Sequence, residues 1–423
     1  DLTKLLHKLQ GKKIAYVAHE ALLGGATLHI LRHLLLMQEV GIKGILYLPD
    51  SEKIYGGDSL PALAHHAKKF GIEVEYIPCR KSVQLIHRSS KDYTDSKIIA
   101  SMFKKRNIGL ICSATYMPAL GIAAEQLHIP NVTTLHQYYP NSHFTKREDV
   151  NIQVIHSSSN RYALEYYRIL NVPSIRIVCP VESAFFDSYK DNIHYVTSEF
   201  TQENPLHILV SGTLQPRKGQ LEAILAIGQL LKQGLPVKLT IIGYDTLNPS
   251  YVSKCRKAAN TLPEGSVTFI GFTEHPEKYY HKVCHILLCS STDESMPQTI
   301  LQSMAAGVLV VSTNCGGVSE IIKDNYNGIL LPDNTPEKLA EGISRLVKLS
   351  VKERQFIVHN AHETISAIAT PSFVRSELIN LYNLAFDRLN LSQISHKKKL
   401  PTFIPQACSQ RDTSSPCPSH PID

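Results

Sequence analysis

The stretch CSSTDESMPQTILQSMAAG, Cys289–Gly307, decides the fold. It follows a short apolar run at 285–288, HILL, which is typical of a buried strand, and leads through a polar loop into a helix. The loop carries a carboxylate, Glu294, and the helix places Gln298 and Gln302 on one face because they are four residues apart. In open parallel sheets, ligands bind at such strand ends. An ordinary strand-to-helix corner with a solvated Glu294 is the alternative.

A second strand end whose side chains could bind a ligand lies upstream, in SGTLQPRKG at Ser211–Gly219. It follows the apolar run at 207–210 and precedes an amphipathic helix, so that Arg217 and Lys218 stand beside a glycine at a helix start. Arginine offers a bidentate fork, lysine a point charge, and the helix N-terminus its N–H groups, which together suit a diphosphate. A pair of solvated cations is the alternative.

The first half of the chain offers two further strand ends. The apolar run at 14–18 leads to Gly24 and Gly25 and then to a helix, an arrangement in which backbone N–H groups can approach a phosphate closely. This pair lacks the spacing of a dinucleotide fingerprint or of a P-loop. His136 ends the buried strand at 132–135, where it is either a ligand-facing or a structural histidine.

Strands alternate with helices along both halves, which predicts an α/β protein with two parallel, doubly wound sheets. We expect the strands of the first sheet at 14–18, 44–48, 74–77, 108–112, 132–135 and 153–155. Those of the second sheet are expected at 207–210, 237–242, 267–270, 285–288 and 308–311. Helices are expected at 95–105, 118–127, 160–170, 336–349 and 351–365, among others.

The length of 423 residues exceeds what one core usually serves and predicts two domains. We expect an N-terminal Rossmann-like domain over 1–185, a polar connection over 186–205, and a C-terminal Rossmann-like domain over 206–370. An amphipathic helix over 371–390 remains after the second sheet, and we expect it to cross back to the first domain. Residues 391–423, rich in Lys, Ser and Pro, are expected to form a disordered tail or a linker.

The composition narrows the function classes. An apolar fraction of 43% and a charged fraction of 19% are those of a soluble globular protein. A net charge of +7 without a dense basic run argues against nucleic acid and suits anionic small ligands or an anionic membrane surface. The nine cysteines are scattered without metal-ligand spacing, as in a reducing compartment.

No apolar stretch is long enough to span a bilayer, and no signal peptide opens the chain. We therefore expect a cytoplasmic protein, with peripheral contact to the inner face of a membrane as an open alternative. The opening segment DLTKLLHKLQ at 1–10 fits either a packed N-terminal helix or a membrane-surface helix. Because the chain begins at Asp1, a processed protein and an excised fragment are both open.

Four segments of the second half, taken in order, resemble glycosyltransferase family 4, the group 1 glycosyl transferases of the GT-B fold class. These segments are SGTLQPRKG, FIGFTEHPEKYY, ESMPQTILQSMAAG and GGVSEIIKDNYNGILL. The first half is similar through Gly24 and Gly25 and through TTLH at its strand end. The resemblance implies two Rossmann-like domains that face each other across a cleft.

The resemblance also implies a retaining glycosyltransferase, of the hexosyltransferase class, that uses neither a metal nor a cofactor. Its substrates would be a nucleotide-diphosphate sugar and a glycan or lipid-linked acceptor, as in polysaccharide biosynthesis. The implied catalytic positions are His136, near the reacting sugar, and Glu294, on the sugar hydroxyls. The implied donor-binding positions are Gly24, Gly25, Arg217, Lys218, Ile270, Gly271, Ser295, Met296, Gln298 and Gln302. Of these, Ile270 and Gly271 would lie at the nucleobase of the donor.

Two departures from the family's pattern keep other functions open. The position that usually carries the ribose-binding acid is Gln302, so the charge-assisted bond to the diol is lost although an amide still donates and accepts. The family's Asn-Gly-Val-Asp segment is replaced by CPVE at 179–182. A non-catalytic GT-B module that binds nucleotide or glycan within a larger assembly, and a nucleotide-sugar epimerase, are therefore the competing hypotheses.

Overall fold

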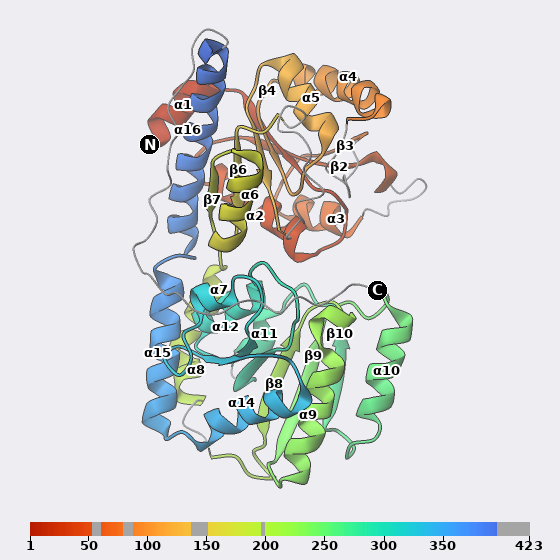
Figure 1. Cartoon of the computed structure of the whole chain (residues 1–423), viewed down its shortest axis with the longest axis vertical. Coiled ribbons are helices and arrows are strands. Elements are labelled where there is room, and N and C mark those ends of the chain that lie inside the picture. Colours follow the sequence, from red (N-terminus) through yellow and green to blue (C-terminus); the bar gives the residue numbers. More distant parts are fainter. Residues whose placement is uncertain (53–60, 79–87, 137–150, 196–198, 282, 396–423) are drawn as a thin grey trace.

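The computed structural model describes residues 1–52, 61–78, 88–136, 151–195, 199–281 and 283–395. They form two α/β domains, one above the other in Figure 1, with the N-terminal half above and most of the C-terminal half below. Most of the tail predicted over 391–423 lies outside the described residues. None of the described helices is both long and apolar enough to cross a membrane.

The first domain is built on a seven-stranded parallel sheet with the order β3-β2-β1-β4-β5-β6-β7. Its strands are β1 (Lys13–Val17), β2 (Gly44–Pro49), β3 (Val74–Ile77), β4 (Ile108–Ser113), β5 (Asn131–Thr134), β6 (Val154–Ser157) and β7 (Ser174–Arg176). Its helices are α1 (Leu2–Leu9), α2 (Gly25–Gln38), α3 (Ala62–Lys69), α4 (Ser90–Lys105), α5 (Pro118–Leu127) and α6 (Asn160–Leu170). The strands β1 and β4 are buried almost throughout, because helices cover both faces of the sheet.

The second domain repeats this plan with a six-stranded parallel sheet of order β10-β9-β8-β11-β12-β13. Its strands are β8 (Leu206–Ser211), β9 (Val237–Ile242), β10 (Val267–Gly271), β11 (Ile286–Cys289), β12 (Leu309–Thr313) and β13 (Ile329–Leu331). Its helices are α9 (Gln220–Lys232), α10 (Pro249–Ala259), α11 (Glu277–Tyr280), α12 (Gln298–Ala306), α13 (Val318–Ile321), α14 (Pro336–Lys348) and α15 (Val351–Ser366).

In both sheets the strand order reverses beside the first strand of the domain, between β1 and β4 and between β8 and β11. Loops that leave the two strands at such a switch point diverge to opposite faces and leave a crevice between them. In the second domain these loops contain the two stretches that the sequence singles out, Ser211–Gly219 and Cys289–Gly307. The fold therefore brings residues about 80 positions apart to one edge of one sheet.

The polar stretch predicted as an irregular connection over 186–205 is in part helical. It contains the end of α7 (Ser183–Asp187) and all of α8 (Tyr189–Tyr195). The side-chain amide of Asn192 on α8 donates to the carbonyls of Tyr280 and Ala306, at 2.9 and 2.7 Å. The connection is thus packed onto the second domain and belongs structurally to it.

The amphipathic helix predicted over 371–390 is α16 (Pro371–Ser395), which leaves the second domain and runs along the first (Figure 1). Leu378 and Tyr382 are buried in the core of the first domain, and the Tyr382 hydroxyl donates to that of Tyr16 at 3.4 Å. Lys8 of α1 pairs with Asp387 of α16 at 2.5 Å. The N-terminal helix α1 therefore packs against both the first domain and the crossover helix α16.

Candidate functional site

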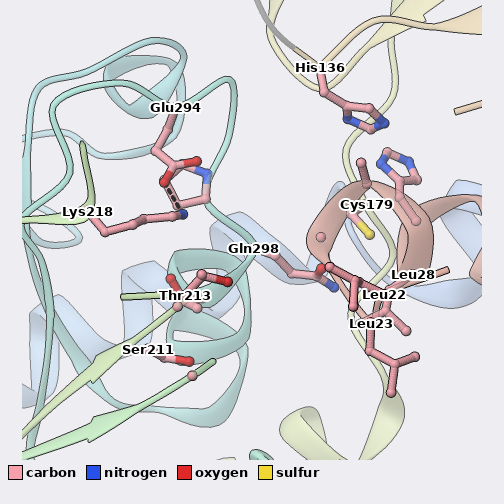
Figure 2. Close-up of a pocket in the computed structure, with 18 of the residues that line it drawn as sticks. Leu22, Leu23, Leu28, His136, Cys179, Ser211, Thr213, Lys218, Glu294 and Gln298 are labelled. Carbon is pink, nitrogen blue, oxygen red and sulfur yellow. Dashed lines mark hydrogen bonds and ion pairs between the residues drawn. The ribbon is translucent and has the colours of Figure 1, made fainter. Parts of the chain in front are cut away.

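A cleft of about 540 Å³ lies where the carboxyl edges of the two sheets face each other. The first domain lines it with the loop after β1, with parts of α2, and with residues after β4 and β5. The second domain lines it with the loops after β8, β9, β10 and β11 and with the start of α12. Figure 2 shows this arrangement, with Glu294 and Lys218 on one side of the cavity and His136 on the other.

The charged centre of the cleft is an ion pair between Lys218 Nζ and Glu294 Oε1. Arg217 approaches the same carboxylate oxygen at 3.5 Å and donates to the carbonyl of Asp293 at 3.0 Å. The side chains of Lys218 and Glu294 are 19% and 12% exposed, so the pair is largely withdrawn from bulk water yet opens into the cleft. Two cations thus share the Glu294 carboxylate, so these three side chains carry one net positive charge, and the neighbouring Asp293 also lines the cleft.

The backbone around this centre is held by close contacts between the loops after β8 and β11. A short 3₁₀ turn, Pro216–Lys218, ends at Gly219, whose φ of +67° is the left-handed conformation that glycine adopts freely. A Cβ on Gly219 would overlap the carbonyl oxygen of Ser290, so the two loops touch through backbone atoms. Ser290 Oγ donates to the carbonyls of Lys218 and Gly219, both at 2.9 Å. These contacts hold the turn that carries Arg217 and Lys218 in place.

The N-terminus of α12 presents unpaired polar groups to the cleft. Within the described residues, Ser295 Oγ and Gln298 Nε2 are buried and have no hydrogen-bond partner, and both residues line the cavity together with Met296. Buried polar groups are nearly always paired in native structures, so such groups at a cavity wall point to a polar ligand. The N–H groups of the first helical turn add a partial positive charge there.

Gln302 lies one turn further along α12 and also lines the cleft. Its Nε2 donates to Glu182 Oε2 at 3.4 Å, and Glu182 in turn forms an ion pair with Arg32 of α2. The structure thus supplies next to Gln302 the carboxylate that the residue itself lacks. Sequence reasoning missed Glu182 and Arg32 as members of the site; the replaced segment at 179–182 was the available signal.

On the first-domain side, Gly24, Gly25 and His136 line the cleft as the sequence predicts. Gly24 is the N-cap of α2, and its N–H donates to Thr27 Oγ1 at 3.0 Å. A Cβ on Gly25 would meet nothing within 4 Å, so this loop leaves open space toward the cavity. This wall also carries the charged residues Glu20 and Arg32 among imidazole, hydroxyl, thiol and aliphatic groups.

Ile270 and Gly271 are the two predicted positions that do not line the cleft. They are the last residues of β10, and Ile270 is 39% exposed on the outer surface. Gly271, with φ of +80°, turns the chain so that the following residues, Phe272 and Thr273, enter the cavity wall. The Phe272 ring stacks on that of Tyr244 with centroids 4.4 Å apart, a flat aromatic surface that the sequence reasoning did not single out.

One group of three side chains in the described part of the chain has its nitrogen atoms close enough together to hold a metal ion. It consists of His29, His33 and His156 in the first domain. It is separate from the Lys218–Glu294 pair, which comes from the second domain. His29 and His136 line the cleft from the first domain, with ring centroids 5.2 Å apart.

Comparison with known proteins finds a family similarity in the second half of the chain. Residues 195–364 match the family model of the group 1 glycosyl transferases. An uncharacterized glycosyltransferase of Methanocaldococcus jannaschii, MJ1607, is 26% identical over 232 residues, which are 53% of this chain and 58% of the relative. The amylovoran biosynthesis glycosyltransferase AmsK of Erwinia amylovora is 34% identical over 149 residues, 34% of this chain and 36% of AmsK. The matched stretches thus span little more than half of these relatives at most.

Solved structures extend the similarity to both domains. A glycosyltransferase of Rickettsia africae superposes with a TM-score of 0.71 at 19% identity and covers 88% of this chain and 98% of its own. HepE of Anabaena, solved in complex with UDP and glucose, gives a TM-score of 0.68 at 18% identity over 87% of this chain and 98% of its own. The fold of this chain is therefore GT-B, as the sequence predicts.

Proposed function

We propose that this chain is a retaining glycosyltransferase of glycosyltransferase family 4, without metal ion or cofactor in the transfer step. It would move a hexose from a nucleotide-diphosphate sugar to a glycan or lipid-linked acceptor in polysaccharide biosynthesis, in the cytoplasm at the inner face of a membrane. The observation that carries the proposal is the ion pair of Lys218 and Glu294 opposite His136 in the cleft between two Rossmann-like domains. The relatives' names and the family match support the same class of activity.

The cation pair would act on the diphosphate. In the absence of a ligand, Glu294 neutralises Lys218 and approaches Arg217 at 3.5 Å. A diphosphate that enters the cleft offers these cations oxygens of higher charge, which would free the carboxylate to accept hydrogen bonds from sugar hydroxyls. When the bond between sugar and phosphate breaks, the negative charge on the leaving diphosphate grows, and fixed cations stabilise that state more than the ground state.

The start of α12 would hold the remaining polar groups of the donor. Ser295 Oγ and Gln298 Nε2, both buried and unpaired, suit a phosphate oxygen or a sugar hydroxyl. The backbone N–H groups of Ser295, Met296 and Gln298 would add to this cradle. Gly24 and Gly25 face the same space from the first domain and would approach the distal phosphate.

Base and ribose would lie toward β9 and β10. The stacked rings of Tyr244 and Phe272 offer an aromatic face for the base, two residues beyond the predicted Ile270. The ribose diol would be recognised by the Gln302 amide together with Glu182, whose side chain remains 41% exposed despite its pairing with Arg32. A carboxylate from a neighbouring segment would thus restore the charge-assisted bond to the diol.

The first-domain wall would receive the acceptor. His136 lies opposite Glu294 in Figure 2 and would contact the reacting end of the donor sugar. In the transfer, the bond from the sugar's anomeric carbon to the phosphate oxygen breaks, and a bond to the acceptor oxygen forms. The acceptor hydroxyl's proton must leave toward a base on the same face if configuration is retained, and an oxygen of the departing diphosphate would be such a base.

A second candidate function is favoured by one specific observation, the amide at Gln302 in place of an acid. A module that binds a nucleotide or a glycan without transferring sugar would need the pocket but not full transition-state stabilisation. The two functions differ in whether nucleoside diphosphate is released from a donor.

The test is release of nucleoside diphosphate from UDP-, GDP-, ADP- and TDP-hexoses, measured with and without added glycan or lipid-linked acceptor. We expect release with donors of one base and a fall of about 100-fold or more in Glu294→Gln, which keeps the size of the side chain but removes its charge. Release that is unchanged in Glu294→Gln would contradict the assignment of Glu294. Binding of a nucleotide without release from any donor would favour the non-catalytic module.

A further inference from the structure

Three buried histidines of the first domain face one another just behind the cleft wall. His29 and His33 lie one turn apart on α2, and His156 lies on β6. Their exposed fractions are 3%, 1% and 1%. The ring centroids of His29 and His33 are 4.3 Å apart, and those of His33 and His156 5.2 Å. The i, i+4 spacing on one helix face is the one with which helices present two imidazoles to a single ion.

Within the part of the chain that the structure describes, each ring of this cluster has one unpaired nitrogen atom. His29 Nε2, His33 Nε2 and His156 Nδ1 are all buried and have no hydrogen-bond partner among the described residues. One nitrogen from each ring lies within 4.8 Å of the others, so the three rings can present nitrogen atoms to a single ion. Three orphaned ring nitrogens in one place are unusual, because each unpaired buried polar atom lowers the stability of the fold.

A buried histidine of the second domain, His285, lies apart from this cluster. It is 4% exposed and accepts a hydrogen bond at Nδ1 from the backbone N–H of His207 at 2.9 Å. It belongs to no group of three side chains that could hold a metal ion in the described part of the chain. The histidines of the first domain differ in that three of them meet.

His156 is oriented by a neighbour in the way that metal ligands usually are. Its Nε2 is hydrogen-bonded to Thr134 Oγ1 of β5 at 2.5 Å, which leaves Nδ1 as the nitrogen available to a ligand. A hydrogen bond to the second nitrogen fixes ring orientation and tautomer in metal-binding histidines. Burial lowers the pKa of all three imidazoles, that of His156 to about 3, so the rings are neutral and their lone pairs available at neutral pH.

We propose that His29, His33 and His156 bind a divalent transition-metal ion, with Zn²⁺ as the best match. An all-imidazole set of three suits Zn²⁺, Cu²⁺, Ni²⁺ or Fe²⁺ and does not suit Mg²⁺ or Ca²⁺, which prefer oxygen ligands. Zn–N bonds of about 2.0–2.1 Å place ligand nitrogens roughly 3.4 Å apart, so small rotations of the rings close the site. The fourth position is open to a water molecule or to His136, whose ring lies 5.2 Å from that of His29.

The ion would join α2 to β6 behind the acceptor wall, on the other side of the cleft from the diphosphate-binding cations. It would set the position of the histidine wall without taking part in the neutralisation of the diphosphate. This inference does not rest on the proposed function, and its test uses metal binding rather than transfer activity.

The experiment uses the full chain, purified without a histidine tag and freed of metal with a chelator. Zn²⁺ is titrated in competition with a chromogenic chelator, and Co²⁺ is added separately as a spectroscopic probe. We expect one equivalent of Zn²⁺ with a dissociation constant below about 1 μM, a visible absorption band of tetrahedral Co²⁺, and a higher melting temperature with Zn²⁺.

The matched variants are His33→Leu, which removes one ligand but fills its volume, and His285→Asn, which alters a buried histidine elsewhere and retains an acceptor. His33→Leu should bind Zn²⁺ at least 100-fold more weakly, whereas His285→Asn should bind like the wild type. Equal binding in His33→Leu and wild type would overturn the site, as would wild-type protein that gives no Co²⁺ band and no Zn²⁺ binding below 100 μM. If His33→Leu does not fold, His156→Gln replaces it under the same criterion.

Discussion

The two walls of the cleft are built on the same plan and carry different side chains. Both lie at the switch point of a parallel sheet, where the first strand of the domain meets its later neighbour. The wall of the second domain carries an ion pair, Lys218–Glu294, next to unpaired polar groups at a helix N-terminus. The wall of the first domain carries His29 and His136 among aliphatic side chains, with the charged residues Glu20 and Arg32. The two sheets share one topology, so the difference between the walls comes from the side chains of their loops.

The backbones of the two walls differ as well. In the second domain, Gly219 and Gly316 have positive φ, and a Cβ on either would overlap a carbonyl oxygen of the loop after β11. In the first domain, a Cβ on Gly25 would meet nothing within 4 Å. The wall of the second domain is thus locked by backbone contacts, whereas the opposite wall has open space at Gly25. A rigid wall suits a fixed diphosphate, and an open one suits a variable acceptor.

The largest effect on this comparison should come from glycine substitutions. Gly316→Ala places a Cβ against the carbonyl oxygen of Glu294 at φ of +53°, so we expect a loss of about 3–5 kcal/mol in the free energy of unfolding. Gly25→Ala has open space and an ordinary φ, and should change stability by less than about 0.5 kcal/mol. Urea denaturation of both variants measures the difference. Equal stability of the two would refute the contrast between a locked and an open wall.

A smaller effect concerns His285, the paired buried histidine of the second domain. Burial, with help from His207 and Arg354, lowers its pKa to about 4. Between pH 6.5 and 4 the unfolded chain takes up a proton there and the folded chain does not, so stability falls as the pH falls. From pH 7 to pH 5 this group should reduce the free energy of unfolding by about 2 kcal/mol.

His285→Asn keeps an acceptor but cannot titrate, so it provides the measurement. Denaturation at pH 7 and pH 5 should show a pH-dependent loss that is about 2 kcal/mol smaller in the variant than in the wild type. The same loss in both proteins would mean that His285 titrates normally and that its burial has no electrostatic consequence.

The smallest effect tests the link between the walls. Gln302→Glu would place a second carboxylate beside Glu182, where Gln302 now donates to it at 3.4 Å. Like charges raise the pKa of the pair, so a penalty of about 1 kcal/mol should appear above about pH 4.5 and vanish at lower pH. The matched control is Gln229→Glu, which changes an exposed amide that donates to Glu337 and should be nearly silent. Equal behaviour of the two variants would break the link between Gln302 and Glu182.

The same contrast explains what the sequence could predict. The second-domain site is encoded in contiguous segments. Arg217, Lys218 and Glu294 were found from local pattern, Ser295 from the family resemblance, and all four lie in the cleft. Gly24, Gly25 and His136 were found from their places at strand ends. Both sheets and the ranges of helices such as α5 and α6 also follow from hydrophobic period and from Pro118 at a helix start.

What could not be predicted depends on contacts between distant segments. The strands β7 and β13 are three residues long and gain their structure from pairing with β6 and β12, not from a pattern of their own. The helix α8 is held in place by the side-chain hydrogen bonds of Asn192, and its sequence shows no clear hydrophobic period that would have predicted it. In the cluster of His29, His33 and His156, the third residue is more than 120 positions from the other two. The spacing of His29 and His33 is visible in the sequence, but only the fold shows that His156 joins them.

Calorimetry on Lys218→Ala shows whether the cation pair of the second domain holds a nucleoside diphosphate. The nucleotide is the one of UDP, GDP, ADP and TDP that raises the melting temperature most, and the control is Lys338→Ala, which breaks an exposed pair with Glu341. We predict a dissociation constant ten- to a hundredfold higher in Lys218→Ala, a loss of about 1.5–3 kcal/mol, and an unchanged constant in the control. Wild-type affinity in Lys218→Ala would contradict the account and place the diphosphate elsewhere.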